Sequence, residues 1–208
     1  MLWAFGYFCV MMLYTFIDIM FWRKMPSQVS EWLNVLTIII CSSIYVMILI
    51  RRWNLNIKEM LNVDWKSIML AIGCACLLYI LLDNFIDPII EKLFPASEAN
   101  YQENISGLKE NLITSFMQVC VIAPVTEEIL MRGFVLDALK DKYDVAVALL
   151  VSSVLFALLH FNMVQTLSAL VSGIILGVLY LKTKSLASSI LAHALYNFMS
   201  FCALFFFT

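Results

Sequence analysis

Long apolar stretches constrain this chain more than any other feature. A helix that crosses a bilayer needs about 20 mostly apolar residues. Seven stretches meet or approach that requirement, at residues 2–22, 33–50, 68–90, 112–139, 145–161, 163–181 and 185–207. The chain is therefore expected to be all-α, a polytopic integral membrane helix bundle with about seven transmembrane helices.

The overall composition supports the same class. Hydrophobic residues make up 63% of the 208 and charged residues 13%, with a mean hydropathy of +0.92. Soluble domains are about one quarter charged, so this chain would expose too much apolar surface in water. The net charge of -2 and the lack of a basic run give no indication of nucleic-acid binding. The lipid bilayer is the partner that the composition predicts, and the composition says nothing about the oligomeric state.

Two polar segments divide the chain. Residues 51–67 interleave basic side chains with Trp and Leu, which is typical of a helix in the headgroup layer. An ordinary solvated loop anchored by tryptophans is the alternative. Residues 91–111 form the longest polar connection. We therefore expect an N-terminal three-span portion over 1–110, with the interfacial segment and the polar loop, and a C-terminal four-helix portion over 111–208.

The distribution of Lys and Arg predicts the orientation. Eight of these residues fall in the loops on the side of the N-terminus and four in the loops on the other side. Cytoplasmic loops carry the excess of positive charge, so the N-terminus is expected in the cytoplasm. Abundant Phe, Ile, Met, Leu and Asn, with little Gly and Pro, are typical of an AT-rich bacterium. These features predict a multi-pass protein of a bacterial cell membrane.

The stretch 112–139 contains two adjacent acids, Glu127 and Glu128, followed by Arg132. Ionised groups at membrane depth require partners. Glu128 and Arg132 are four residues apart and face each other on a helix, so they are expected to pair. Glu127 then points into the bundle as a candidate general base for water. Alternatively, Pro124 interrupts the helix and Thr126 caps a restarted one, with both acids in its first turn.

Two further motifs contain the only histidines of the chain. Phe156 and His160 form the first, and His193 and Asn197 the second, each pair one helical turn apart. A histidine at the end of a span can be an interfacial side chain, and a His–Asn pair can be a hydrogen-bonded contact between helices. The catalytic interpretation is that His193 and Asn197 donate hydrogen bonds to a developing oxyanion.

Glu127, His160 and His193 together have the donor atoms of a metal site. Two imidazoles and one carboxylate can hold Zn2+ or another divalent metal. The same side chains can instead hold and deprotonate a water without a metal, with Glu127 and His160 activating it. Both versions predict hydrolysis of an amide by an activated water, and the residue types allow either.

The three motifs, Glu-Glu-x-x-x-Arg, Phe-x-x-x-His and His-x-x-x-Asn, resemble those of the CPBP intramembrane proteases. That family includes the type II CAAX prenyl endopeptidases and the bacterial Abi proteins associated with bacteriocin self-immunity. The resemblance covers about residues 110–205. It implies an all-helical bundle with Glu127, His160, His193 and Asn197 as the reaction centre, supported by Glu128, Arg132 and Phe156.

The resulting expectation is an intramembrane metallo- or glutamate-type endopeptidase that cuts a peptide or protein in or near the bilayer. In a bacterium, the substrate is expected to be a bacteriocin, a pheromone precursor or another membrane peptide rather than a prenylated protein. Two alternatives stay open. One is a non-catalytic immunity or scaffold protein that binds a toxin or partner. The other is a small transporter whose buried Glu and His relay protons.

Overall fold

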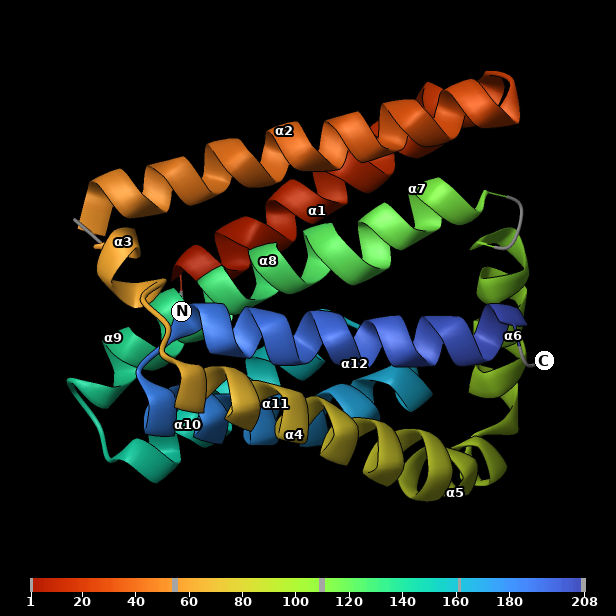
Figure 1. Cartoon of the computed structure of the whole chain (residues 1–208). Coiled ribbons are helices and arrows are strands. Elements are labelled where there is room, and N and C mark those ends of the chain that lie inside the picture. The colour runs from red at the N-terminus through yellow and green to blue at the C-terminus, as the bar shows by residue number, and fades with distance from the viewer. Residues whose placement is uncertain (1, 54–55, 109–110, 161, 207–208) are drawn as a thin grey trace.

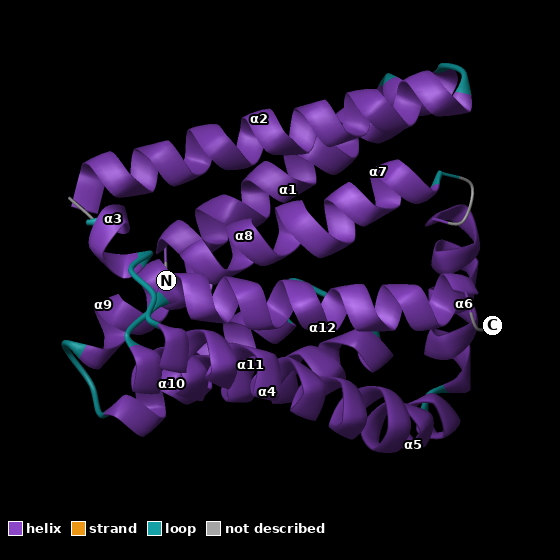
Figure 2. Ribbon diagram, viewed as in Figure 1, coloured by secondary structure: helices purple, strands orange, loops and turns teal. Residues whose placement is uncertain are grey.

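The computed structural model describes residues 2–53, 56–108, 111–160 and 162–206. Within these ranges the chain is helical throughout, with short turns and no strand (Figure 2). Seven helical rods coincide with the seven apolar stretches of the sequence. The N-terminus and the C-terminus lie at opposite ends of the bundle (Figure 1). The predicted all-α helix bundle is confirmed.

Four of the described helices are long and apolar enough to cross a membrane. These are Gln28–Arg52, Trp65–Leu93, Met163–Thr183 and Leu186–Phe205. Many large apolar side chains on the helices are exposed, as expected for a surface in contact with lipid. The chain is therefore a polytopic membrane protein.

The first two rods form a hairpin along one side of the bundle (Figure 1). It consists of α1 (Leu2–Met20), the short turn η1 (Trp22–Lys24) and α2 (Ser27–Trp53). Asn34 Nδ2 donates to Asp18 Oδ1 at 2.8 Å, and Trp22 Nε1 donates to Thr37 Oγ1 at 3.2 Å. The bond from Asn34 gives Asp18, the acid of the first apolar stretch, a polar partner.

The two predicted polar segments differ from expectation. Residues 51–67 do not form one interfacial helix, because α2 continues to Trp53 and only α3 (Ile57–Met60) is helical before α4 (Trp65–Leu81). Asp64 caps α4 by accepting from the Ser67 N–H at 2.9 Å. Hydrogen bonding by the Ser67 side chain, and then by its N–H, lowers the pKa of Asp64. Residues 54–55, in the same segment, lie outside the described part of the chain.

The region predicted as a polar connection is largely helical. The helix from α4 continues through η2 (Leu82–Ile86) and α5 (Asp87–Leu93), and α6 (Pro95–Leu108) follows after one residue. Proline is favourable at the first position of a helix and Glu98 lies in the first turn of α6, so the sequence starts a helix there. In Figure 1, α6 crosses the end of the bundle near the C-terminus. The predicted boundary at 110/111 adjoins residues 109–110, which are outside the described residues.

The rod with the acidic motif is one continuous helix with two widened sections. Its parts are α7 (Leu112–Phe116), η3 (Met117–Ile122), α8 (Ala123–Glu128), η4 (Ile129–Leu136) and α9 (Asp137–Lys140). Both η3 and η4 have π-helical hydrogen bonding. The break predicted at Pro124 is wrong, because the wider turn of η3 accommodates the proline. Thr126 does not cap a new helix either, since its hydroxyl donates to the carbonyls of Ile122 and Ala123.

The last three rods are α10 (Val145–Ala157), α11 (Met163–Thr183) and α12 (Leu186–Phe206). With 13 residues, α10 is about 20 Å long, which is shorter than a full span. It packs against α11 and η4, while α12 packs against α4 and α8. Because α4 shares a buried core with α11 and α12, the third predicted span belongs to the same packed unit as the four C-terminal rods.

Candidate active site

Glu128 and Arg132 form a fully buried ion pair, as their spacing predicts. Arg132 Nη1 lies 2.8 Å from Glu128 Oε1, and the two side chains are 1% and 0% exposed. Arg132 Nη2 also donates to the Gly173 carbonyl of α11 at 3.0 Å. Among the described residues, Glu128 Oε2 has no hydrogen-bond partner. The ion pair therefore connects η4 to α11, and the second carboxylate oxygen of Glu128, Oε2, takes no part in it.

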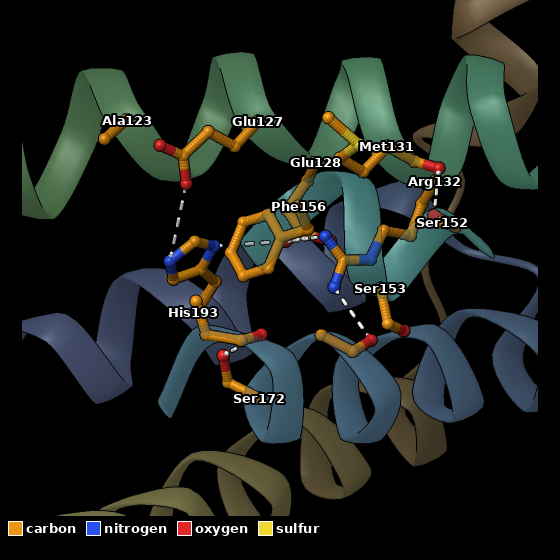
Figure 3. A network of polar contacts seen from close by, with 12 residues as sticks. Ala123, Glu127, Glu128, Met131, Arg132, Ser152, Ser153, Phe156, Ser172 and His193 are labelled. Carbon is orange, nitrogen blue, oxygen red and sulfur yellow. Dashed lines mark hydrogen bonds and ion pairs between the residues drawn. The ribbon is translucent and has the colours of Figure 1, made fainter. Parts of the chain in front are cut away.

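His193 of α12 contacts both adjacent acids of α8. Its Nδ1 lies 3.0 Å from Glu128 Oε1, and its Nε2 lies 3.9 Å from Glu127 Oε2 (Figure 3). The first distance is that of a hydrogen bond, while the second is too long for a direct one. Glu127 is 18% exposed, so it is more accessible than Glu128. The two consecutive acids thus differ as predicted, one paired inside the protein and the other accessible beside an imidazole.

The ring of Phe156 lies among three of the predicted site residues. The Arg132 guanidinium carbon is 4.8 Å from its centroid, and the rings of His160 and His193 are 5.4 and 5.7 Å away, both edge-on. Figure 3 shows Phe156 between His193 and Arg132. The buried Phe156 ring is thus a shared contact of the two histidines, which are 33 residues apart in the sequence.

His160 lies just beyond the end of α10, not on a regular helical turn. The Leu159 and His160 N–H groups make tight-turn hydrogen bonds to Phe156 O and Ala157 O. The imidazole Nδ1 of His160 lies 3.2 Å from Phe156 O. Asn162 then starts α11 by accepting from Val164 N and Gln165 N. A turn between two helices therefore holds His160, half-buried, at the edge of the site.

Asn197 contacts the acidic rod at a different place from His193. Its Nδ2 donates to the backbone carbonyl of Val119, in η3, at 2.8 Å. Asn197 therefore lies against the helical rod that contains Glu127. One N–H of the Asn197 amide is hydrogen-bonded to the backbone of that rod. Sequence reasoning did not identify the carbonyls of Val119 and Gly173 as contacts, because no side chain marks a carbonyl that receives a distant donor.

The predicted metal ligands do not gather as a metal site. Among the described residues, no three His, Cys, Asp or Glu side chains form a group that could hold a metal ion. Glu127 is nearest to His193, and the closest contact of His193 is with Glu128, which is itself paired with Arg132. The arrangement is an acid–imidazole–acid contact stabilised by an arginine.

The fold and this site define a polytopic membrane protein with a buried carboxylate–imidazole cluster. Residues 109–199 match the family model described as "Type II CAAX prenyl endopeptidase Rce1-like". A Bacillus subtilis (strain 168) protein named "Putative membrane peptidase YdiL" is 32% identical over 77 residues. That match covers 37% of this chain and 32% of the relative, so the chain aligns with about a third of its length. No solved structure matches the chain.

Both matches agree with the resemblance that the three motifs indicate, and the family-model match lies in residues 109–199. The matched region contains all of the predicted site residues.

Proposed function

We propose that the protein is an intramembrane endopeptidase that hydrolyses a peptide bond of a membrane-associated peptide or protein. The observation that carries this proposal is the contact of His193 with both acids, at 3.0 Å from Glu128 and 3.9 Å from Glu127. A water about 2.8 Å from both Glu127 Oε2 and His193 Nε2 fits across the longer gap. Such a water lies beside a carboxylate able to accept its proton.

Glu127 is the proposed general base. It accepts a proton as the water oxygen attacks the substrate carbonyl, and His160, at the edge of the same aromatic cluster, helps to orient that water. His193 and Asn197 are the proposed donors to the oxyanion that forms on the carbonyl oxygen. The proton held by Glu127 then passes to the leaving amine when the peptide bond breaks.

The charges of the cluster favour this division of roles. Glu127 and Glu128, if both ionised, leave one negative charge uncompensated by Arg132. His193 lies between the two acids, with Nδ1 facing Glu128 and Nε2 facing Glu127, so its ring is the polar group of α12 nearest to that charge. A proton on Nε2 is the one placed to donate to the developing oxyanion.

The substrate is proposed to be a peptide that lies in or near the bilayer. A bacteriocin or a pheromone precursor is the proposed physiological substrate, and self-immunity or peptide processing the proposed role. The protein is further proposed to lie in a bacterial cell membrane with a cytoplasmic N-terminus. Reporter fusions at both chain ends test that orientation, since the seven predicted spans would put the two ends on opposite sides.

Cleavage of membrane-proximal peptides by the purified protein tests the function. Wild type, Glu127→Gln and the control Asp141→Asn, which neutralises an exposed acid in the turn after α9, are reconstituted in vesicles with a mixed peptide library. Mass spectrometry of the products should show cleavage by wild type and the control, and a loss of about 100-fold or more in Glu127→Gln. Equal cleavage by all three proteins contradicts the proposal.

Repeating the assay with a chelator distinguishes the two versions of the chemistry. Loss of cleavage that added Zn2+ restores indicates a metal-dependent reaction, whereas unchanged cleavage indicates the metal-free one. The alternative class, a non-catalytic immunity or scaffold protein, predicts a cellular phenotype that survives both Glu127→Gln and His193→Ala. Such a result without any cleavage would favour the binding protein.

A further inference from the structure

The helix around Pro124 has an unusual hydrogen-bond register. The Ala123 N–H, immediately before the proline, donates to the carbonyl of Gln118, five residues earlier. In that π-helical register, the next donor along the chain would be residue 124 and its acceptor the carbonyl of Val119. Proline has no N–H. The Val119 carbonyl therefore lacks the backbone donor that this register would give it.

The side chain of Asn197 supplies a donor to this carbonyl. Asn197 Nδ2 donates to Val119 O at 2.8 Å, although the two residues are 78 positions apart. Pro124 itself is fully buried, and α12 packs against both η3 and α8 at this place. A carbonyl in an apolar helix bundle requires a partner, because lipid and packed side chains offer no hydrogen bond. The missing N–H of Pro124 and the position of the Asn197 amide are thus linked.

We propose that Pro124 is a positioning residue for the reaction, because its missing N–H leaves the Val119 carbonyl to hold the Asn197 amide. This inference rests on the proposed peptidase function. The amide group of asparagine has two N–H bonds. With one of them fixed on Val119 O, the amide plane is held in one orientation, and the second N–H is oriented for the oxyanion of the substrate.

A second place in the chain has the same local structure and provides a matched control. After η2, the Asp87 N–H donates to the carbonyl of Leu82, again five residues earlier, and Pro88 follows at the start of α5. None of the proposed catalytic residues belongs to this segment. Pro88→Ala therefore restores an N–H after a π-helical turn in the same way as Pro124→Ala, but in a segment that contains none of the site residues.

The test compares these variants in the peptide-cleavage assay. Pro124→Ala and Pro124→Val both restore the N–H but differ in side-chain volume, so a loss common to both reports the N–H and not a change in side-chain volume. We expect kcat to fall about 100-fold in both, as when one oxyanion donor is removed, with KM within about 2-fold because substrate binding is unchanged. Pro88→Ala should keep the wild-type kcat. The thermal unfolding midpoint should not fall, because alanine and valine both suit a helix better than proline does.

Two further measurements separate positioning from a general effect on structure. The double variant Pro124→Ala/Asn197→Ala should cleave no more slowly than Asn197→Ala alone. Pro124→Ala acts only by releasing the Asn197 amide, which Asn197→Ala already removes. The side-chain amide resonance of Asn197, in selectively labelled protein, should shift in Pro124→Ala and stay in place in Pro88→Ala. An unshifted resonance, or a Pro124→Ala kcat equal to that of Pro88→Ala, overturns the inference. Absence of any cleavage by wild type instead contradicts the proposed function, and the amide resonance still decides the inference.

Discussion

His193 and Glu128, 65 residues apart in the sequence, are joined by a contact of 3.0 Å between Nδ1 and Oε1 in the buried part of the bundle. The same carboxylate oxygen lies 2.8 Å from Arg132 Nη1. Glu128 therefore links the cation of its own helix to the imidazole of α12. Through this link, the arginine determines the orientation of the His193 ring and so the position of Nε2 relative to Glu127.

The buried pair is expected to behave as a unit in stability measurements. Arg132→Met leaves Glu128 as an uncompensated buried charge, so it should lower the free energy of unfolding by about 3–5 kcal/mol. Adding Glu128→Gln removes that charge and should recover part of the loss. Unfolding of both variants in detergent measures the difference. If the losses in free energy of unfolding caused by Arg132→Met and Glu128→Gln simply add, the two side chains do not stabilise each other and the expectation is contradicted.

Phe156→Leu is expected to reduce activity more than stability. A buried apolar exchange of similar volume costs less than about 1.5 kcal/mol, but leucine cannot make the edge-on contacts with His160 and His193. On the same preparation, the rate of peptide cleavage should therefore fall while the thermal unfolding midpoint changes little. Phe201→Leu is the control, because among the described residues the ring contacts of Phe201 are with Phe116 and Phe205, at 5.9 and 4.2 Å, and not with the histidines. Similar activity in both variants would contradict a special role for Phe156.

Gly173→Ala is expected to displace Arg132. A Cβ at Gly173 would lie 3.2 Å from Phe156 Cδ1 and from Ser153 Cα, so α10 must give way by a few tenths of an ångström. That adjustment shifts the Gly173 carbonyl that accepts from Arg132 Nη2. Since a displacement near 1 Å can lower kcat by about 100-fold, this smaller shift should lower kcat by roughly several-fold in the peptide assay.

Gly177→Ala provides the control for that prediction. It lies one turn later on α11, where an added Cβ meets the flexible end of Leu149 instead of the polar cluster. Gly177→Ala should lower the free energy of unfolding by an amount comparable to Gly173→Ala, while peptide cleavage is retained. If Gly177→Ala loses as much activity as Gly173→Ala, packing of α10 on α11 explains the loss and the carbonyl contact does not.

Much of the architecture could be predicted from local sequence. The apolar stretches determined the number and order of the rods, and the spacing of Glu128 and Arg132 predicted their pairing. The helical structure of Pro95–Leu108 was missed because its polarity resembles that of a loop. The continuity of the helix at Pro124 was missed because a proline normally ends or kinks an α-helix, and only a π-helical turn accommodates it here.

The details of the site depended on tertiary contacts. The 33-residue spacing of Glu127, His160 and His193 indicated that three helices contribute to it, but not which acid His193 would contact. That contact depends on the packing of α12 against α8. The backbone acceptors for Arg132 and Asn197 also depend on helix packing, so no sequence pattern could identify them.

The most direct test of the account is a double-mutant cycle between Glu127 and His193 on peptide cleavage. If both residues act on the same water and carbonyl in one step, Glu127→Gln and His193→Gln should each lower kcat/KM by about 100-fold or more. The double variant should then be little slower than the slower single one. Losses that multiply in the double variant would show independent roles, and full activity in either single variant would contradict a shared reaction centre.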